Sequence, residues 1–419
     1  MTQPVDQSLS AGPELVAAEL EPATSGFTLP TGRVRRWLAF ALLLSSAPCS
    51  TIIFAALGPV LPSLAAEFGK HGNGSFIAQM IMAMPGLGTL FGGLISGVLL
   101  EKLGLRRLLL GGLVLYVLAG TAGLYVNEAW ELLASRFVLG MIVATHSTCV
   151  MVLLSEWVDG GLRAKLLGFT GALSGAVSVT AINLSGALSL AGGWRAPFSI
   201  YLLGAVFLVC ALLVLTRAYD RVSKRGERAQ GSLKPLIPAY LMTFALYLVV
   251  MMTAIQVPLL LAAAGIHNPT TRSLMLSFGS IGASSSGFLF GWLIRGLGQR
   301  WIMVFSTALT ATGFILVGLV SDPRLVGAGC LTFGFGCGMV TPFVGNLILE
   351  KAQASVRARA VGLIFVIASV AEFANPILIA PLQAAVGIRG AFLTVGLMVA
   401  AASLLAGGRA LLGRREQPA

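Results

Sequence analysis

The chain repeats a stretch of its own sequence 194 residues further on, and this repeat limits the possible folds more than any other feature. Segment 156–168 returns as segment 350–362, where Glu156, Arg163 and Gly168 correspond to Glu350, Arg357 and Gly362. The same offset relates Gly97 to Gly291, Leu99 to Leu293, Gly104 to Gly298, Arg106 to Arg300, Gly140 to Gly334, Gly193 to Gly387, Arg195 to Arg389, and Phe198 to Phe392. One register held over so many positions indicates two copies of a unit of roughly 190 residues. In an apolar chain, parallel repeats are typical of transporters.

The composition predicts a membrane protein. Of the 419 residues, 56% are hydrophobic and 11% are charged, and the mean hydropathy is +0.89. Soluble domains carry about 25% charged residues, so this chain cannot cover its surface in water. The net charge of +12 alone would fit a nucleic-acid partner. However, the basic residues lie in short interruptions between apolar runs, mostly on one side, so we expect contact with lipids and none with nucleic acid.

Twelve apolar runs are long enough to cross a bilayer as helices, which need about 20 residues each. Only helices and closed barrels satisfy the backbone in lipid, and these run lengths without strict alternation exclude a barrel. The expected spans are 37–64, 77–100, 106–126, 130–155, 164–190, 196–216, 236–264, 273–294, 301–320, 325–349, 360–386 and 390–412. The predicted fold class is therefore all-α, a polytopic membrane protein of two six-helix bundles.

The predicted organisation has five parts: a disordered tail (1–35), an N-terminal bundle (36–216), a linker (217–235), a C-terminal bundle (236–412) and a C-terminal tail (413–419). The polar tail lacks the basic start and apolar core of a secretory signal. Lys and Arg gather on one side of the spans, which the positive-inside rule places in the cytoplasm. We therefore expect both termini in the cytoplasm and the chain in a bacterial inner membrane. The basic linker could in addition bind anionic lipid headgroups.

The connection after the second span resembles the signature loop of the major facilitator superfamily, Gly-x-Leu-x-Asp-Arg-x-Gly-Arg-Arg. The loop keeps Gly97, Leu99, Gly104 and Arg106 and is followed by Arg107. Glu101 replaces the Asp, Lys102 replaces the first Arg, and Leu105 replaces a basic residue. The segment Leu132-x-x-x-Arg136-x-x-x-Gly140 is similar to one found in facilitator-type antiporters, although the fifth span lacks their Gly-Pro segment. The resemblance implies two bundles that expose a central cavity to each side in turn.

The basic side of both halves carries the predicted gating residues. Glycines permit close helix contact and tight turns, and Glu101 can pair with an arginine or with a helix N-terminus. The resemblance implies that these charges form a cytoplasmic latch when the protein faces outward. Ordinary surface ion pairs, which contribute about 0–1 kcal/mol each, are the alternative. The gating set is Gly97, Glu101, Lys102, Gly104, Arg106, Arg107, Glu156, Arg163, Gly291, Arg295, Gly298, Arg300, Glu350 and Arg357.

Ionisable residues within the spans are candidate functional sites, because burying a charge in lipid is costly. Glu372 lies in the eleventh span, with Asn375 one turn away on the same face. Pro376 removes the backbone bond to the carbonyl of Glu372, so the helix is expected to bend there. A low dielectric disfavours a charged carboxylate, which makes Glu372 the expected proton carrier. A hydrogen bond that serves helix packing is the alternative.

Arg136 and His146 complete the predicted proton-coupling set. Arg136 is either a receptor for a substrate anion or a structural tie to backbone carbonyls, and His146 either titrates or makes an inter-helix hydrogen bond. The predicted substrate-binding residues are Arg136, Gln79, Asn183, Gln256 and Asn375. A polar side chain in a span can also form a hydrogen bond that only holds packed helices together, so both substrate binding and helix packing stay open for the amides.

Signals of an enzyme or a cofactor are missing. The chain has no phosphate loop, and its cysteines lack metal-ligand spacing: Cys49, Cys149, Cys210, Cys330 and Cys337. The predicted function is secondary active transport of a small amphipathic or lipophilic solute by alternating access, as proton-coupled efflux by a monomer. One alternative is uptake or facilitated diffusion of a small organic anion. Another, since fold does not fix function, is a non-transporting receptor or scaffold on the same fold.

Overall fold

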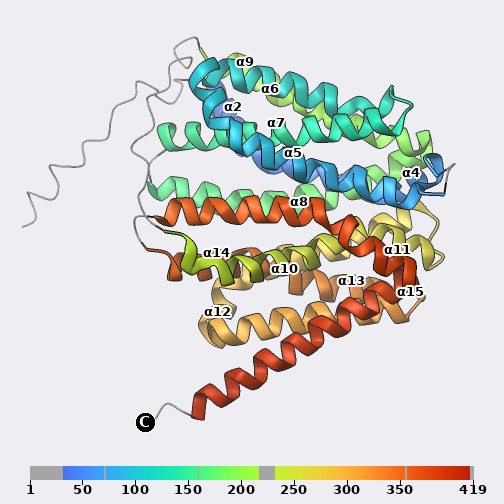
Figure 1. Cartoon of the computed structure of the whole chain (residues 1–419). Helices are drawn as coiled ribbons and strands as arrows, with labels where there is room; N and C mark the ends of the chain where they lie inside the picture. Colours follow the sequence, from blue (N-terminus) through green and yellow to red (C-terminus); the bar gives the residue numbers. More distant parts are fainter. Residues whose placement is uncertain (1–31, 70–71, 159, 217–231, 354–355, 416–419) are drawn as a thin grey trace, which may run out of the picture.

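A computed structural model describes residues 32–69, 72–158, 160–216, 232–353 and 356–415, and within these ranges it contains no β-strand. Figure 1 shows long helices that lie side by side. The N-terminal half comprises α2 (Arg33–Leu44), α3 (Ser46–Ala55), η1 (Gly58–Val60), α4 (Leu61–Glu67), α5 (Gly74–Leu103), α6 (Leu105–Gly120), η2 (Thr121–Leu124), α7 (Ala129–Trp157), α8 (Gly160–Gly192), η3 (Gly193–Leu202) and α9 (Leu203–Val214). The C-terminal half comprises η5 (Lys234–Leu236), α10 (Ile237–Ile255), α11 (Val257–Ala263), α12 (Pro269–Leu319), α13 (Pro323–Gly338), α14 (Val340–Lys351) and α15 (Arg357–Arg415).

Nine helical stretches of the described residues are long and apolar enough to cross a membrane. Three of them, of 54, 51 and 51 residues, are too long for one crossing of a hydrocarbon core about 30 Å thick. Each contains a glycine in the left-handed region, where the chain reverses: Gly193 (φ 66°), Gly298 (φ 77°) and Gly387 (φ 70°). Glycine adopts this conformation at no steric cost. Counting each long stretch as a hairpin gives twelve crossings, the number predicted from the apolar runs.

The internal repeat is reproduced in the packing of the two halves. A methyl group added to Gly88 of α5 would strike the backbone carbonyl of Phe137 on α7, and one added to Gly282 of α12 would strike that of Leu331 on α13. The second pair is the first pair moved along the sequence by the repeat offset. The α5–α7 and α12–α13 contacts are therefore one interface built twice, with glycines that allow the two backbones to touch.

Three local features differ from the sequence prediction. Helix α2 begins at Arg33, so the predicted disorder up to residue 35 is wrong at its end; residues 1–31 lie outside the described residues. Most of the predicted linker, 217–231, also lies outside them. The seventh span is interrupted at Gln256, between α10 and α11. The sequence predicted a bend at Pro376, but α15 keeps helical dihedral angles there and departs from them only at Gly387.

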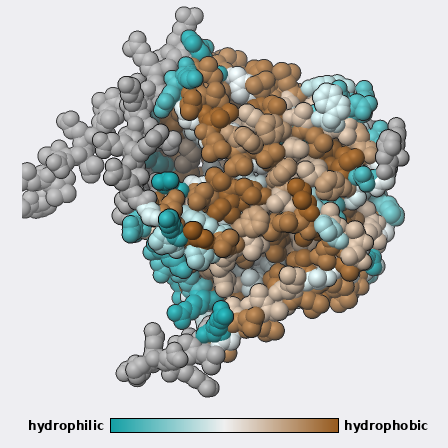
Figure 2. Space-filling model, in the orientation of Figure 1, coloured by the Kyte–Doolittle hydropathy of each residue, from teal (hydrophilic) through white to brown (hydrophobic). Residues whose placement is uncertain are grey.

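The outer surface is apolar over most of the helix length. Figure 2 shows hydrophobic residues over the middle of the visible face and hydrophilic residues gathered at its left end. Large side chains such as Phe288, Trp292 and Leu404 are strongly exposed, as expected for helices that contact lipid rather than water. We call the end that carries Arg106, Arg163, Arg300 and Arg357 the basic end, and the other end the opposite end.

The two halves meet along two antiparallel helix pairs. The first crossing of α12 packs against α8, and the first crossing of α15 packs against α5. We call these contacts the α8–α12 seam and the α5–α15 seam. At the opposite end, η1 and α4 also contact α11. The helices that end at the basic end, such as α2 and α14, make their main contacts within their own half.

Candidate transport cavity

A cavity of about 470 Å³ lies between the two halves, at the middle of the spans. The first, fifth, seventh, eighth and tenth crossings contribute its walls. The described residues that line it include no charged side chain, and they combine aromatic and aliphatic surface with hydroxyl groups. The main polar and aromatic lining residues are Ser50, Thr51, Phe54, Ser178, Thr253, Ser280, Phe333, Cys337 and Thr341.

Two hydroxyl groups of this cavity, those of Ser50 and Thr253, are better acceptors than donors. Ser50 Oγ donates to the carbonyl of Ser46 at 2.8 Å, and Thr253 Oγ1 donates to that of Val250 at 2.7 Å. A hydroxyl has one proton and two lone pairs, so these oxygens keep lone pairs for another molecule. The walls therefore suit a neutral or amphipathic solute that carries hydrogen-bond donors. A lone organic anion would find no cation among the described lining residues.

None of the five predicted substrate-binding residues is among the residues that line the cavity. The sequence analysis selected charges and amides, because these are the most costly side chains to place in lipid. The walls are instead built from serine, threonine and phenylalanine, which are common in membrane helices. The only sequence signal was the occurrence of hydroxyl groups at middle depth in several spans, and this is also ordinary helix packing.

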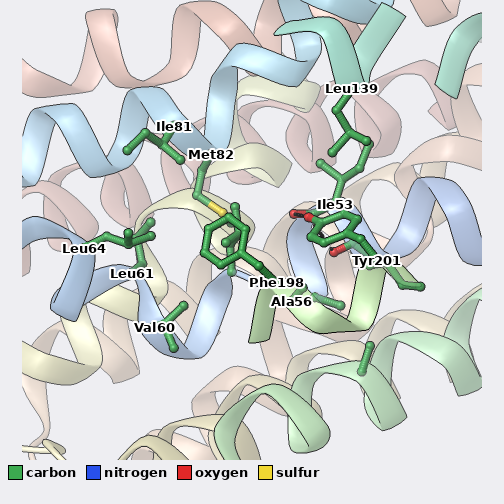
Figure 3. Packing of buried hydrophobic residues seen from close by; sticks show 14 of the residues in the cluster. Ile53, Ala56, Val60, Leu61, Leu64, Ile81, Met82, Leu139, Phe198 and Tyr201 are labelled. Atoms are coloured by element: carbon green, nitrogen blue, oxygen red, sulfur yellow. Dashed lines mark hydrogen bonds between the residues drawn. The ribbon is translucent and has the colours of Figure 1, made fainter. Parts of the chain in front are cut away.

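Arg136 lies in the core of the N-terminal half, away from the cavity, and is fully buried. Its guanidinium donates to the carbonyls of Ala119 and Gly120 at 2.8 and 2.9 Å and to the hydroxyl of Tyr201 at 3.0 Å. It also lies 5.1 Å and 5.0 Å from the ring centres of Phe198 and Tyr201. Both rings belong to the apolar cluster of Figure 3. These contacts favour the structural tie, one of the two alternatives for Arg136.

His146 joins α7 to the junction of α2 and α3. Its Nε2 lies 2.8 Å from Ser45 Oγ, which donates its own proton to the carbonyl of Leu42 at 2.6 Å. The tautomer with a proton on Nε2 fits both contacts, because Ser45 has a single proton and Nε2 then donates to its oxygen. Nδ1 is buried and has no hydrogen-bond partner within the described part of the chain. This arrangement is the inter-helix hydrogen bond that was one of the alternatives for His146.

Glu372 lies in the α5–α15 seam. A methyl group added to Gly86 of α5 would sit 2.8 Å from the Glu372 carboxyl carbon, so the absence of a side chain at Gly86 makes room for the carboxyl group. Oε1 of Glu372 is buried and has no hydrogen-bond partner among the described residues. The structure thus places this acid between the two halves rather than in the wall of the cavity.

Three of the predicted polar residues meet at the α5–α15 seam, towards the opposite end. Gln79 Nε2 donates to Gln383 Oε1 at 3.1 Å, Gln383 Nε2 to Gln256 Oε1 at 2.6 Å, and Gln256 Nε2 to Gln79 Oε1 at 2.9 Å. Gln256 also donates to Asn375 Oδ1 at 3.0 Å, and Asn375 Nδ2 donates to the carbonyl of Leu248 at 2.9 Å. Sequence reasoning missed Gln383, because a single amide near the end of a span carries no distinguishing pattern.

Asn183, the remaining predicted amide, lies in the α8–α12 seam. Its Nδ2 donates to Ser277 Oγ at 2.7 Å and to the carbonyl of Val179 in its own helix at 2.8 Å. Next to it, the hydroxyls of Ser178 and Ser280 lie 2.9 Å apart. Polar side chains thus bridge both seams between the halves.

The gating arginines with described hydrogen bonds cap helix ends in their own half. Arg163 donates to the carbonyls of Ser155 and Val158 at 2.7 and 3.0 Å, and Arg357 donates to that of Ala352 at 3.3 Å. Cations near the end of a helix satisfy its last carbonyls. Val158 and Ala352 are related by the repeat offset, so the same cap occurs twice.

The other gating residues lie at the same end. Arg106 donates to Leu215 O at 3.1 Å, and Arg295 to Gly291 O at 2.9 Å. Gly104 and Gly298 form matching turns, with φ of 78° and 77°. The exposed members of the set are Glu101, Lys102, Arg107, Gly291, Arg295, Gly298, Arg300, Glu350 and Arg357, the half-buried members are Gly97, Arg106, Glu156 and Arg163, and Gly104 is buried.

Comparison with known proteins finds partial sequence similarity to several proteins that are named as transporters or as multidrug resistance proteins. An arabinose-proton symporter of Escherichia coli is 26% identical over 157 residues, which cover 38% of this chain and 33% of the symporter. The multidrug resistance protein MdtG of Dickeya zeae is 29% identical, with 42% of each chain covered. The 4-hydroxybenzoate transporter PcaK of Pseudomonas aeruginosa is 31% identical, with 46% and 44% covered. The matches therefore span less than half the length of these relatives.

The fold has a match among solved structures. Two structures of the nucleoside transporter NupG superpose with TM-scores of 0.66 and 0.62 at 14% identity, covering 87% and 90% of this chain and 98% and 100% of theirs. The family model of the Major Facilitator Superfamily matches twice, over residues 43–241 and 239–418, once for each half. Members of this family are transporters rather than enzymes. The chain is thus an integral membrane protein and belongs to the Major Facilitator Superfamily.

Proposed function

We propose that this protein is a secondary active transporter that carries a small neutral or amphipathic solute by alternating access. The observation that supports this most is the uncharged cavity between the two halves, at the middle of the spans. Its volume of about 470 Å³ is in the range of cavities that hold small molecules. The cavity belongs to neither half alone, so a change in the angle between the halves would change the side to which it opens.

The arrangement of the two halves corresponds to one end state of such a cycle. The contacts between the halves lie in the two seams and at the opposite end, while the helices of the basic end pack within their own half. The positive-inside rule puts the basic end in the cytoplasm, and a bacterial inner membrane is the proposed location. In this orientation the cavity is closed towards the outside. The predicted charged latch at the basic end would form in the other end state.

Proton coupling through Glu372 is the proposed source of energy. A buried carboxyl group is costly to ionise when one of its oxygens has no hydrogen-bond partner, as is the case for Oε1 of Glu372. Opening the α5–α15 seam would expose the same group to water, where the carboxylate is stable. Protonation and the movement of the two halves would therefore influence each other, which is the requirement for coupling. The relatives include a protein named as a proton symporter and one named for multidrug resistance, which supports both coupling and efflux.

Transport of an organic anion is the second candidate, because one relative is named as a 4-hydroxybenzoate transporter. The predicted anion receptor, Arg136, is occupied by carbonyls of its own half. An anion would therefore have to bind the cavity without it. The uncharged lining favours the neutral solute.

The test uses proteoliposomes with a trapped pH dye, to which neutral amphiphiles, lipophilic cations and aromatic acids are added in turn. We expect a neutral or amphipathic compound to evoke a pH change in the wild type and none in Glu372→Gln. The control is Ser277→Ala, which removes a hydrogen-bond acceptor in the α8–α12 seam at a residue outside the cavity lining. A response that survives in Glu372→Gln would remove the proposed coupling. A response to aromatic acids alone would replace the neutral solute by the anion.

A further inference from the structure

We propose that Gln79, Gln256 and Gln383 form a latch that holds the two halves together at the opposite end and must open before the cavity can face that side. We call these three side chains the amide ring. The inference rests on the proposed alternating access, but it concerns the closure of the cavity and neither the solute nor the coupling ion.

The amide ring is closed and directional. Each of the three carboxamides donates one hydrogen bond to the next and accepts one from the previous, at 3.1, 2.6 and 2.9 Å. Gln79 and Gln256 are 2% and 0% exposed, so the bond between them is shielded from water, while Gln383 is half-buried. Such a cycle satisfies one donor and one acceptor in every member, and buried polar groups are stable only when they are satisfied in this way.

The C-terminal half holds its part of the ring in place. Gln256 follows the last residue of α10, where the helix is interrupted before Pro258, which has no N–H to donate to the carbonyl of Ala254. Asn375 of α15 accepts from Gln256 and donates to the backbone of α10, which connects the two helices. The bond from Gln383 to Gln256 also lies within this half.

Gln79 is the only member of the ring from the N-terminal half. Separation of the halves at this end would break two bonds of the ring, those from Gln79 to Gln383 and from Gln256 to Gln79. It would leave the C-terminal pair intact and ready to close again. Because all three side chains are neutral, opening leaves no unpaired charge, and water entering the gap can replace the lost bonds. These properties suit a contact that forms and breaks in every cycle.

The equivalent positions of the other seam carry no such ring. The repeat offset relates Gln79 to Ser273 and Gln383 to Ser189. Ser273 donates to Pro269 O and Ser189 to Gly186 O, each within its own helix. A methyl group added to Gly186 would collide with Ser273 Oγ, so this seam is closed there by tight packing. The latch therefore belongs to the α5–α15 seam alone.

The experiment measures the opening of this end directly. Spin labels at Asn73→Cys and Ala385→Cys, one exposed position on each side of the α5–α15 seam, report the distance between the halves by double electron–electron resonance in proteoliposomes. The background replaces the five native cysteines. We expect Gln79→Leu to raise the ratio of long to short distances by about tenfold, which corresponds to about 1.4 kcal/mol for two lost hydrogen bonds. Ser75→Ala, which removes only an acceptor outside the ring, should leave the ratio unchanged.

An unchanged ratio in correctly folded Gln79→Leu would overturn the latch. If that variant does not fold, Gln383→Leu replaces it, and the same outcome applies. An equal increase in Ser75→Ala would also overturn the proposal, because the effect would then come from loosening α5 in general. The measurement needs no solute or proton gradient. If the distance ratio does not change, the latch is wrong, but the proposed transport in proteoliposomes is unaffected. If no solute is transported, a shifted distance ratio would still support the latch.

Discussion

The two seams between the halves are related by the internal repeat, and they carry different side chains at equivalent positions. The repeat offset relates Ser178 to Glu372 and Gly86 to Ser280. In the α8–α12 seam the two serines share a hydrogen bond of 2.9 Å. In the α5–α15 seam the same two positions hold a carboxyl group packed on a glycine, with Oε1 lacking a partner in the described structure. One seam is chemically satisfied, and the other contains an ionisable group whose environment depends on how tightly the halves close.

This difference indicates that the two seams have different roles. Duplication supplied two equal contact surfaces, and substitution at single positions gave one of them an acid and an amide ring. We infer that the α8–α12 seam keeps the halves in register while the α5–α15 seam responds to protons and opens. Variants at equivalent positions can therefore separate a role in packing from a role in transport.

The largest expected effect on stability comes from a buried charge that lies in neither seam. Arg136→Leu leaves two carbonyls and a tyrosine hydroxyl without their donor, and each buried polar group left unsatisfied costs about 1–3 kcal/mol. We expect a large fall in the melting temperature of the purified protein. Cys330→Ala, at the equivalent position of the C-terminal half, should lower it far less. Similar losses in both variants would contradict the structural role of Arg136.

The second prediction changes the chemistry of the two seams without changing their shape. Glu372→Gln keeps the volume of the side chain but cannot release a proton, so solute-evoked pH changes in proteoliposomes should disappear. Ser277→Ala, in the α8–α12 seam and outside the cavity lining, should retain them, because the hydroxyl that it removes is not an acid. Loss of the signal in both variants would show that the two seams act alike.

The third prediction concerns space in the α5–α15 seam. Gly86→Leu introduces a side chain whose first carbon already lies 2.8–2.9 Å from Glu372 atoms. Overpacking of this kind costs about 1–3 kcal/mol, which should appear as a lower melting temperature. Gly93→Leu on the same helix is the control, because an added carbon there meets nothing within 4 Å. Equal shifts for the two variants would mean that Gly86 is not the point of closest contact.

The smallest effect is expected from the satisfied seam. Asn183→Leu removes the 2.7 Å bond to Ser277, and hydrogen bonds between membrane helices contribute about 0.6 kcal/mol on average. The melting temperature should therefore fall slightly, and solute-evoked pH changes should persist. A complete loss of transport in this variant would assign the α8–α12 seam a role beyond packing.

The sequence by itself determined the number of crossings, their grouping and the family. These follow from local properties that any conformation of the chain shares: the length of an apolar run, the spacing of the repeat, and glycines such as Gly298 and Gly387 that permit a left-handed turn. It also identified Glu372, Gln79, Gln256 and Asn375 as unusual, because polar groups in lipid are costly wherever they lie.

Only the tertiary structure decided what these residues touch. The amide ring joins residues 127, 177 and 304 positions apart, and no local pattern encodes such a meeting. Arg136 and Glu372 are both ionisable residues in spans, yet one is enclosed by carbonyls within a half and the other lies between halves. The cavity is lined by hydroxyl and aromatic groups that are unremarkable in any single helix. Its chemistry arises from the packing of five helices, because a lining is a property of neighbours and not of a segment.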